Sequence, residues 1–265
     1  HDDPRDYGAE ALEIYEDLGD LVGQGKVWNN LGMAAYYRGD WSSTVEAWER
    51  SRDTQTRAGD AAGAATSVNN LGEVFSDRGD LDRAEEMFRD ALRAYEAAGF
   101  PTGVALATSN LARVEARRGR RRTAVEMLEK AKTLFAELGA QAFVTDTQLR
   151  IAEAHAFGGA FEEAMSALAE IPAESGVPGL EAGIHRLRGL AAWHAGDRVT
   201  AESLLASSVT SATEASIPYE RALSQDLLAA LTGDSEARRQ ATETLARLGA
   251  EAAPRLPLPE DSDGR

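Results

Sequence analysis

Cysteine is absent from this chain of 265 residues. Its absence excludes disulfide bonds and thiolate metal sites, and it fits a reducing compartment, so we expect a cytoplasmic protein. Long apolar runs are also missing, since none approaches the roughly 18 residues that a membrane-spanning helix needs. The first residues lack the pattern of a signal peptide. We therefore expect no membrane partner.

Basic residues are scarce relative to acidic ones. The chain has 28 Lys and Arg against 44 Asp and Glu, a formal net charge of −16. Because neutralising phosphates requires a basic face, this balance argues against nucleic-acid binding. The acidic surface keeps an extended molecule soluble, or it steers basic partners towards the chain.

Catalytic and metal-binding motifs are missing as well. The sequence has no glycine-rich phosphate loop of the Lys-Ser/Thr type, no Gly-x-Ser-x-Gly turn and no His-Glu-x-x-His pair. No two of His155, His185 and His194 have the i, i+4 spacing of a helical metal site. We therefore expect a protein that is not an enzyme and that uses no metal and no cofactor.

Glycine is spaced evenly, and no proline interrupts the segments between Tyr7 and Phe100. Glycine recurs every twenty residues, at positions 19, 39, 59, 79, 99, 119, 139 and 159. Glycine adopts the left-handed conformation that ends a helix at no steric cost. Aspartate follows it at positions 20, 40, 60 and 80, where a short acceptor side chain caps the next helix. The pattern predicts antiparallel helices of nearly equal length, about 17 residues each.

Alternate segments differ, so the repeating unit has forty residues. Asn29-Asn30-Leu31-Gly32 recurs as Asn69-Asn70-Leu71-Gly72 and weakens to Ser109-Asn110-Leu111-Ala112. In the other segments Phe88 occupies the place of Trp48. We expect the small residues to let the two helices of a hairpin approach closely, while the large ones fill the space between hairpins. Strand-like alternation is nowhere sustained, so the predicted fold class is all-α.

These residues resemble the tetratricopeptide repeat (TPR). The resemblance rests on a set of aromatic, Leu-Gly and small positions in the first unit, namely Trp28, Leu31, Gly32, Gly39, Trp48 and Ser51. The second unit carries Leu71, Gly72, Phe75, Gly79, Ala84, Phe88 and Ala91. The units are longer than the usual repeat of about 34 residues. The resemblance implies a right-handed α-solenoid of antiparallel helix hairpins, a TPR-like superhelix.

The runs NNLG and YYRGDW are similar, more specifically, to the C-terminal TPR arrays of bacterial signal-transduction ATPases, which include adenylate/guanylate cyclase-linked and LuxR-type regulators. This similarity implies the regulatory C-terminal part of a larger bacterial signalling protein. Tyr7 to Leu18 matches only the second helix of a hairpin, so we expect the array to have been cut from a longer chain.

The predicted domain organisation is a single solenoid over residues 1–252. It consists of a half repeat at 1–19, repeats at 20–59, 60–99, 100–139 and 140–176, a relaxed repeat at 177–215 and a capping hairpin at 216–252. From Pro254 onward, prolines and acidic residues predict a disordered tail, residues 253–265.

The recurring asparagines are the main candidates for partner binding. In a TPR-like array the first helices line the concave face, and an amide side chain both donates and accepts, so it can hold a peptide backbone. The candidate set is Asn29, Asn30, Asn69, Asn70 and Asn110. The alternative is that these side chains hydrogen-bond along the solenoid to neighbouring helices.

Other residues are expected on the same inner face. Tyr36 and Tyr37 could supply an aromatic pocket of the kind that dominates binding energy, whereas Trp28, Trp41 and Trp48 are expected in the core. Charged candidates for peptide binding are Glu73, Arg113 and Arg117, and the same face would include Lys26, Met33, Asp77, Glu153 and His194. The arginines from 117 to 122 could bind a phosphate or an acidic partner, or they could pair with nearby acids such as Glu115 and Glu126.

The function predicted from the sequence is a protein-protein interaction scaffold that binds a peptide or a partner segment in its concave groove. Other domains of the same parent chain are possible partners. Two alternatives are a peptide- or ligand-sensing module of a transcription regulator and a noncatalytic arm of a nucleotide cyclase or ATPase.

Overall fold

The computed structural model describes residues 7–171 and 178–259. These residues form thirteen α-helices and no β-strand. In chain order the helices are α1 (Tyr7–Asp17), α2 (Leu21–Arg38), α3 (Trp41–Ala58), α4 (Ala61–Arg78), α5 (Leu81–Ala98), α6 (Pro101–Arg117), α7 (Arg121–Glu137), α8 (Gln141–Phe157), α9 (Phe161–Ala169), α10 (Pro178–His194), α11 (Arg198–Glu214), α12 (Pro218–Thr232) and α13 (Ser235–Leu248).

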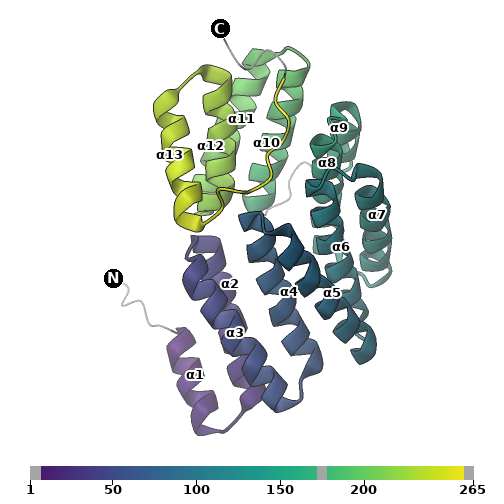
Figure 1. The fold of residues 1–265 in the computed structure, drawn as a ribbon, viewed down its shortest axis with the longest axis vertical. Helices are drawn as coiled ribbons and strands as arrows, with labels where there is room; N and C mark the ends of the chain where they lie inside the picture. Colours follow the sequence, from purple (N-terminus) through teal and green to yellow (C-terminus); the bar gives the residue numbers. More distant parts are fainter. Residues whose placement is uncertain (1–6, 172–177, 260–265) are drawn as a thin grey trace. The chain divides into compact units, whose positions relative to one another are not determined.

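The chain divides into two compact units. Unit 1 is His1–Ser76 with Asp80–Ala107, and unit 2 is Asp77–Gly79 with Thr108–Arg265. In each unit, consecutive helices pack side by side as hairpins, such as α2 with α3 and α10 with α11 (Figure 1). The predicted all-α solenoid of antiparallel helix hairpins is therefore confirmed.

The evenly spaced glycines end the helices as predicted. All eight have positive φ angles, from 61° at Gly19 to 88° at Gly79, a region that other residues enter only with strain. The aspartates that follow accept hydrogen bonds from backbone N–H groups of the next helix, as Asp20 does from Gly23 and Asp40 from Ser43. Each Gly-Asp pair thus ends one helix and caps the next.

Close approach within a hairpin explains the recurring Leu-Gly pair. A Cβ atom on Gly32 would lie 2.5 Å from the Trp48 ring, and one on Gly72 would lie 2.6 Å from the Phe88 ring. The aromatic ring of the second helix therefore packs directly on the backbone of the first. Trp41 and Trp48 are buried as predicted, and Trp28 is half-buried beneath the Arg50 guanidinium.

A buried serine pair repeats in both units and shows that the relaxed repeat keeps the geometry of the first. In unit 1 the Ser51 hydroxyl donates to the Gly25 carbonyl and lies 2.8 Å from the Ser67 hydroxyl. In unit 2 the Ser208 hydroxyl donates to the Ala182 carbonyl and lies 2.7 Å from the Ser224 hydroxyl. Both sets have sequence separations of 26 and 16 residues. Helices α10, α11 and α12 therefore reproduce the arrangement of α2, α3 and α4.

The segment predicted as a C-terminal tail contributes to the core of unit 2. Residues 253–259 contain no helix, Ala253 and Leu256 are buried, and Leu256 belongs to the hydrophobic cluster of unit 2. Proline favours an extended backbone here and does not prevent packing. The rest of the predicted tail, 260–265, lies outside the described residues, as do residues 172–177, where the predicted repeats 140–176 and 177–215 meet.

Candidate partner-binding surfaces

The recurring asparagines are mostly inside the array. Asn69 and Asn110 are completely buried, Asn70 is nearly so, Asn29 is half-buried and Asn30 is exposed. The Asn70 Nδ2 atom donates to Asn29 Oδ1 at 2.9 Å, across consecutive first helices of unit 1. In unit 2, Arg150 Nη1 donates to Asn110 Oδ1. These contacts favour the alternative in which the amides bond along the solenoid, and among the five candidates only Asn30 is exposed.

Substitution of the buried and the exposed asparagine is expected to separate these roles. Asn110→Ala removes a buried amide that accepts from Arg150 and should lower the free energy of unfolding by about 1–3 kcal/mol. Asn30→Ala removes an exposed side chain and should change the free energy of unfolding by less than about 0.5 kcal/mol. Urea denaturation followed by circular dichroism measures both. An equal effect of the two substitutions would contradict the structural role of Asn110.

The two candidate tyrosines lie in different surroundings. Tyr36 stacks on Trp41, with ring centroids 5.8 Å apart and planes 9° apart, and it also packs against Trp48. The Trp41 indole N–H donates to the Tyr36 carbonyl, so Tyr36 belongs to the aromatic core of the first hairpin. Tyr37 is 51% exposed. It is the tyrosine of the pair that remains accessible to a partner.

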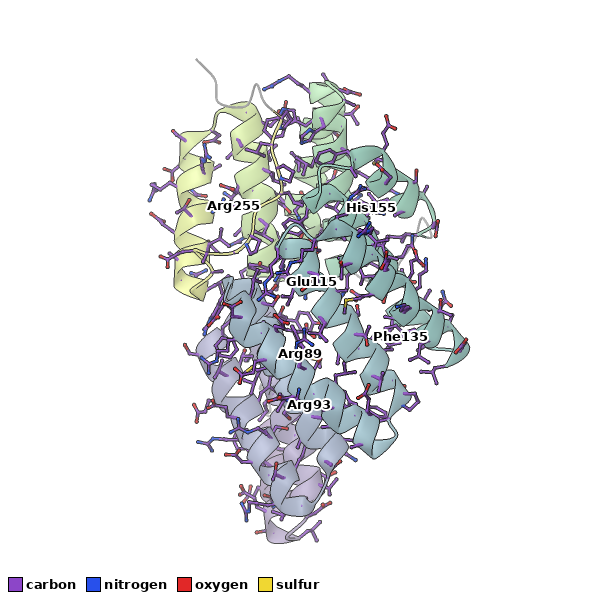
Figure 2. The ribbon with its side chains drawn as sticks, turned by 45° about the vertical axis from the view of Figure 1, so that its right-hand side comes forward. Arg89, Arg93, Glu115, Phe135, His155 and Arg255 are labelled. Atoms are coloured by element: carbon purple, nitrogen blue, oxygen red, sulfur yellow. The ribbon has the colours of Figure 1, made fainter. Side chains whose placement is uncertain are left out.

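The arginine cluster between α6 and α7 is distributed among separate acidic partners. Arg120 donates to both carboxylate oxygens of Glu115 at 3.0 Å, and Arg118 lies 3.7 Å from the same residue. Arg121 instead faces His155 and Glu163 (Figure 2 labels Glu115 and His155). Pairing with Glu115 follows the second of the two expectations for this cluster, in which the arginines pair with nearby acids.

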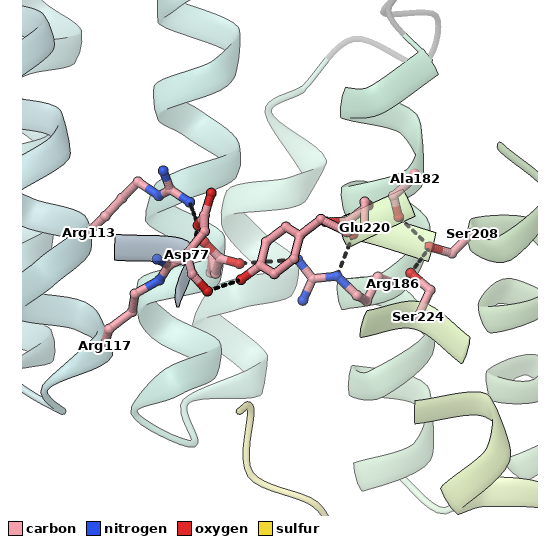
Figure 3. Close-up of polar contacts among 10 residues, drawn as sticks. Asp77, Arg113, Arg117, Ala182, Arg186, Ser208, Glu220 and Ser224 are labelled. Carbon is pink, nitrogen blue, oxygen red and sulfur yellow. Dashed lines mark hydrogen bonds and ion pairs between the residues drawn. The ribbon is translucent and has the colours of Figure 1, made fainter. Parts of the chain in front are cut away.

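Arg113 and Arg117, both predicted to bind a partner, converge on one buried carboxylate. They lie 3.2 Å and 2.7 Å from Asp77 Oδ1, and Asp77 and Arg117 are only 1% and 5% exposed. The Tyr219 hydroxyl donates to the Asp77 carbonyl at 3.3 Å, and burial raises the pKa of that tyrosine. Figure 3 shows the arginines approaching Asp77. Both guanidinium groups are thus held inside unit 2.

The buried charges continue along the first helices of unit 2. Arg186 lies 3.1 Å from Glu153 and 2.5 Å from Glu220, and its side chain is 7% exposed. Burial by itself would raise the pKa of Glu153, but the positive charges of Arg186, Arg113 and Arg117 outweigh it, and the pKa is lowered. Ion pairs therefore link α4 to α6 through Asp77, and they link α10 to α8 and α12 through Arg186 (Figure 3). The sequence prediction had included neither Arg186 nor Glu220.

An exposed row of side chains remains on the first complete hairpin of unit 1. Lys26, Asn30, Met33 and Tyr37 are all exposed on α2, and their spacing of four, three and four residues places them on one helical face. Met33 is 41% exposed and Tyr37 is 51% exposed. We call these four residues the α2 row. The other predicted residue in this unit, Glu73 on α4, is half-buried.

The described residues hold no group of three or more His, Cys, Asp or Glu side chains placed to bind a metal ion. Within the same part of the chain, none of the helices combines the length and apolar character required to cross a bilayer.

Comparisons with protein families identify the repeats. Residues 23–97 match a family model described as tetratricopeptide repeat, and residues 104–138 match a second model with the same description. No curated protein matches the chain.

Comparisons with solved structures agree with the observed fold. The chain is similar to the apo form of RapI, with 17% identity and a TM-score of 0.64 over 92% of this chain and 93% of that one. It is also similar to BtubC (BKLC) from P. vanneervenii, with 18% identity and a TM-score of 0.53 over 79% of this chain and 89% of that one. At these identities the similarity shows the fold alone.

Proposed function

We propose that this chain, in which residues 23–97 and 104–138 match tetratricopeptide-repeat models, is a noncatalytic scaffold that binds an extended segment of a partner protein. The α2 row is the observation that carries the proposal. It presents an amide, a thioether, a phenol and an ammonium group in one line along a first helix. Hairpins that are rigid before binding limit the entropy cost of association to that of the partner.

The chemistry of the α2 row defines the segment that fits it. Met33 adapts its shape to different apolar side chains, and Tyr37 offers a flat apolar ring with a polar tip. Asn30 can both donate to and accept from a peptide backbone, and Lys26 favours an acidic residue at one end. The row therefore suits an extended segment that carries one or two apolar side chains beside an acidic one.

The buried charges of unit 2 support a scaffold rather than a binding site at Arg113 and Arg117. Their positive charges are balanced by Asp77 and Glu153, so a ligand would have to replace existing ion pairs. Of the residues predicted to bind a peptide, we therefore propose Asn30 and Tyr37 as direct contacts. We propose structural roles for Asn29, Asn69, Asn70, Asn110, Tyr36, Arg113 and Arg117.

A role in a larger signalling protein extends this proposal. The absence of cysteine fits the cytoplasm, and the NNLG and YYRGDW runs resemble regulatory arrays of bacterial signalling ATPases. We propose that the array acts as the regulatory part of such a protein, with another domain of the parent chain or a separate protein as its partner.

Substitution of the α2 row tests the proposed surface. Peptides are first selected from a display library on the wild-type chain, and their Kd values are then measured for Met33→Ser/Tyr37→Ser. We expect at least about a tenfold loss of affinity, because exposed aromatic and thioether groups dominate such contacts. Val199→Ser is the matched control, since Val199 is 82% exposed on α11, a second helix of its hairpin. Unchanged affinity in the double variant, or an equal loss in the control, contradicts the proposal.

A further inference from the structure

The C-terminal segment, residues 249–259, begins by packing against the turn that ends α4. The Arg78 Nε atom donates to the Leu248 carbonyl at 3.2 Å. A Cβ atom on Gly79 would lie only 2.0 Å from the Ala252 carbonyl oxygen. In contrast, a Cβ atom on Gly59 or Gly119 would meet nothing within 4 Å. The open side of the Gly79 turn is therefore filled by the backbone of the C-terminal segment.

From there the segment lies along the first helices α12 and α10 (Figure 1). Leu256 is 7% exposed and belongs to the same buried cluster as Leu227, Leu231 and Trp193, and Leu258 packs against that cluster. Arg255 pairs with Asp226 of α12. At the end of α10, the His194 Nε2 atom donates to the Pro257 carbonyl at 2.9 Å.

These contacts are of the kind that a groove makes with a peptide ligand. The segment has no helix or strand between Ala253 and Pro259. Prolines at 254, 257 and 259 favour an extended backbone. Leu256 packs in the buried cluster, Arg255 pairs with Asp226, and the Pro257 carbonyl accepts a hydrogen bond from His194. Such extended, proline-containing segments are a recurrent class of peptide ligand because little conformational entropy is lost on binding.

We infer that the face formed by α10 and α12 is a second peptide-binding surface, which the chain's own C-terminal segment occupies. Its partner is an extended, proline-flanked segment with the pattern basic residue, leucine, proline, leucine. The partner takes the place of Arg255, Leu256, Pro257 and Leu258. The surface lies in unit 2 and is independent of the α2 row proposed in unit 1.

The segment can leave this face without unfolding the hairpins. Arg255 and Pro257 remain exposed while the segment is bound, and the Arg255 side chain is 47% exposed. Elements with few buried side chains open locally at a lower free energy than the core. A tethered segment competes at an effective concentration of about millimolar, so it excludes weak ligands until it is displaced.

A labelled peptide with the sequence of residues 252–259 (AAPRLPLP) tests the inference on the full chain. The variant Leu256→Ser/Leu258→Ser removes the intramolecular competitor while leaving α10 and α12 unchanged. We expect fluorescence anisotropy to show at least about tenfold tighter binding to this variant than to wild type. The same peptide with both leucines replaced by serine is the control and should not bind. A variant that keeps its helical circular dichroism but binds the peptide no tighter than wild type overturns the inference.

A second variant covers the case in which the double serine variant fails to fold. Arg255→Glu places a negative charge beside Asp226 at an exposed position, so the hairpins stay intact while the segment is weakened. We expect at least about threefold tighter peptide binding than in wild type, and no gain would overturn the inference. Met33→Ser/Tyr37→Ser should bind this peptide like wild type. That result separates failure at this surface from failure of the proposed function in unit 1.

Discussion

Replacing Arg186 with methionine is expected to lower the free energy of unfolding by about 3–5 kcal/mol, because it leaves two carboxylates in a buried position without their shared cation. Glu153 and Glu220 lie 3.1 Å and 2.5 Å from the guanidinium, and their side chains are 18% and 16% exposed. Methionine has a similar length and keeps most of the apolar packing. The loss of stability therefore measures the effect of removing the positive charge. Urea denaturation of the wild type and of Arg186→Met at neutral pH measures this loss.

Arg239→Met is the matched control for this prediction. Arg239 also pairs with two glutamates, Glu236 and Glu243, but all three side chains are more than half exposed. Because solvent screens exposed pairs, this variant should denature at the same urea concentration as wild type. A similar loss of stability in both variants would show that the effect does not depend on the burial of Arg186.

The pH dependence of the Arg186→Met effect has a definite sign. The pKa of Glu153 is lowered in the folded chain despite the opposing effect of burial. Its stabilising contribution is therefore complete above the unfolded pKa, about 4.3 for glutamate, and is lost as the pH falls through the lower folded value. In the variant, Glu153 lacks that cation and is protonated more readily. Because the unfolded pKa is common to both proteins, we expect the difference in stability between wild type and variant to narrow as the pH falls from the folded pKa of Glu153 in the variant to the lower one in wild type.

Much of the hairpin architecture was predictable from the sequence because helix ends depend on local chemistry. A glycine with positive φ and an aspartate cap act on their immediate neighbours. The even spacing of the glycines therefore defined the helices from α2 to α8, and aspartates cap the helices from α2 to α5. The contact of Gly72 with Phe88 was predictable for a similar reason, since a missing side chain and a large one recur in register. Each of these features follows from the spacing of residues along the chain.

The roles of the inner polar residues could not be predicted in the same way. Their register shows that they share a face, but it does not show whether the neighbouring first helix is close enough to pair with them. A signal was present in the charges, since Asp77 and Arg117 are 40 residues apart and have opposite sign. After Gly159 the spacing shortens, and Arg186 lies 33 residues from Glu153 and 34 from Glu220. The fixed forty-residue register therefore missed Arg186.

The packing of the C-terminal segment was not predictable from composition, because composition averages over side chains that act individually. Leu256 and Leu258 are separated by one proline, so in an extended backbone their side chains lie on the same side. The structure places both against the core cluster of unit 2. An alternating leucine pattern within a proline-rich stretch is the sequence feature that indicates packing here.

Gly79→Ala is expected to destabilise the chain by about 2–5 kcal/mol, and Gly59→Ala by only about 1–2 kcal/mol. Both residues have positive φ angles, 88° and 74°, so both substitutions carry the cost of a left-handed alanine, about 1–2 kcal/mol. Only at Gly79 would the added methyl group overlap a backbone oxygen, that of Ala252. A backbone atom cannot avoid the overlap by changing rotamer, so a further cost of about 1–3 kcal/mol is expected from overpacking.

The two glycine variants also report on the C-terminal segment, because the overlap is relieved when residues 249–252 move away from the turn. Gly79→Ala should therefore bind the labelled peptide AAPRLPLP more tightly than wild type, whereas Gly59→Ala should bind it equally. Urea denaturation and fluorescence anisotropy on the same preparations give both quantities. Equal destabilisation by the two substitutions, with no gain in peptide binding at Gly79→Ala, would show that the segment is not seated on the Gly79 turn in solution.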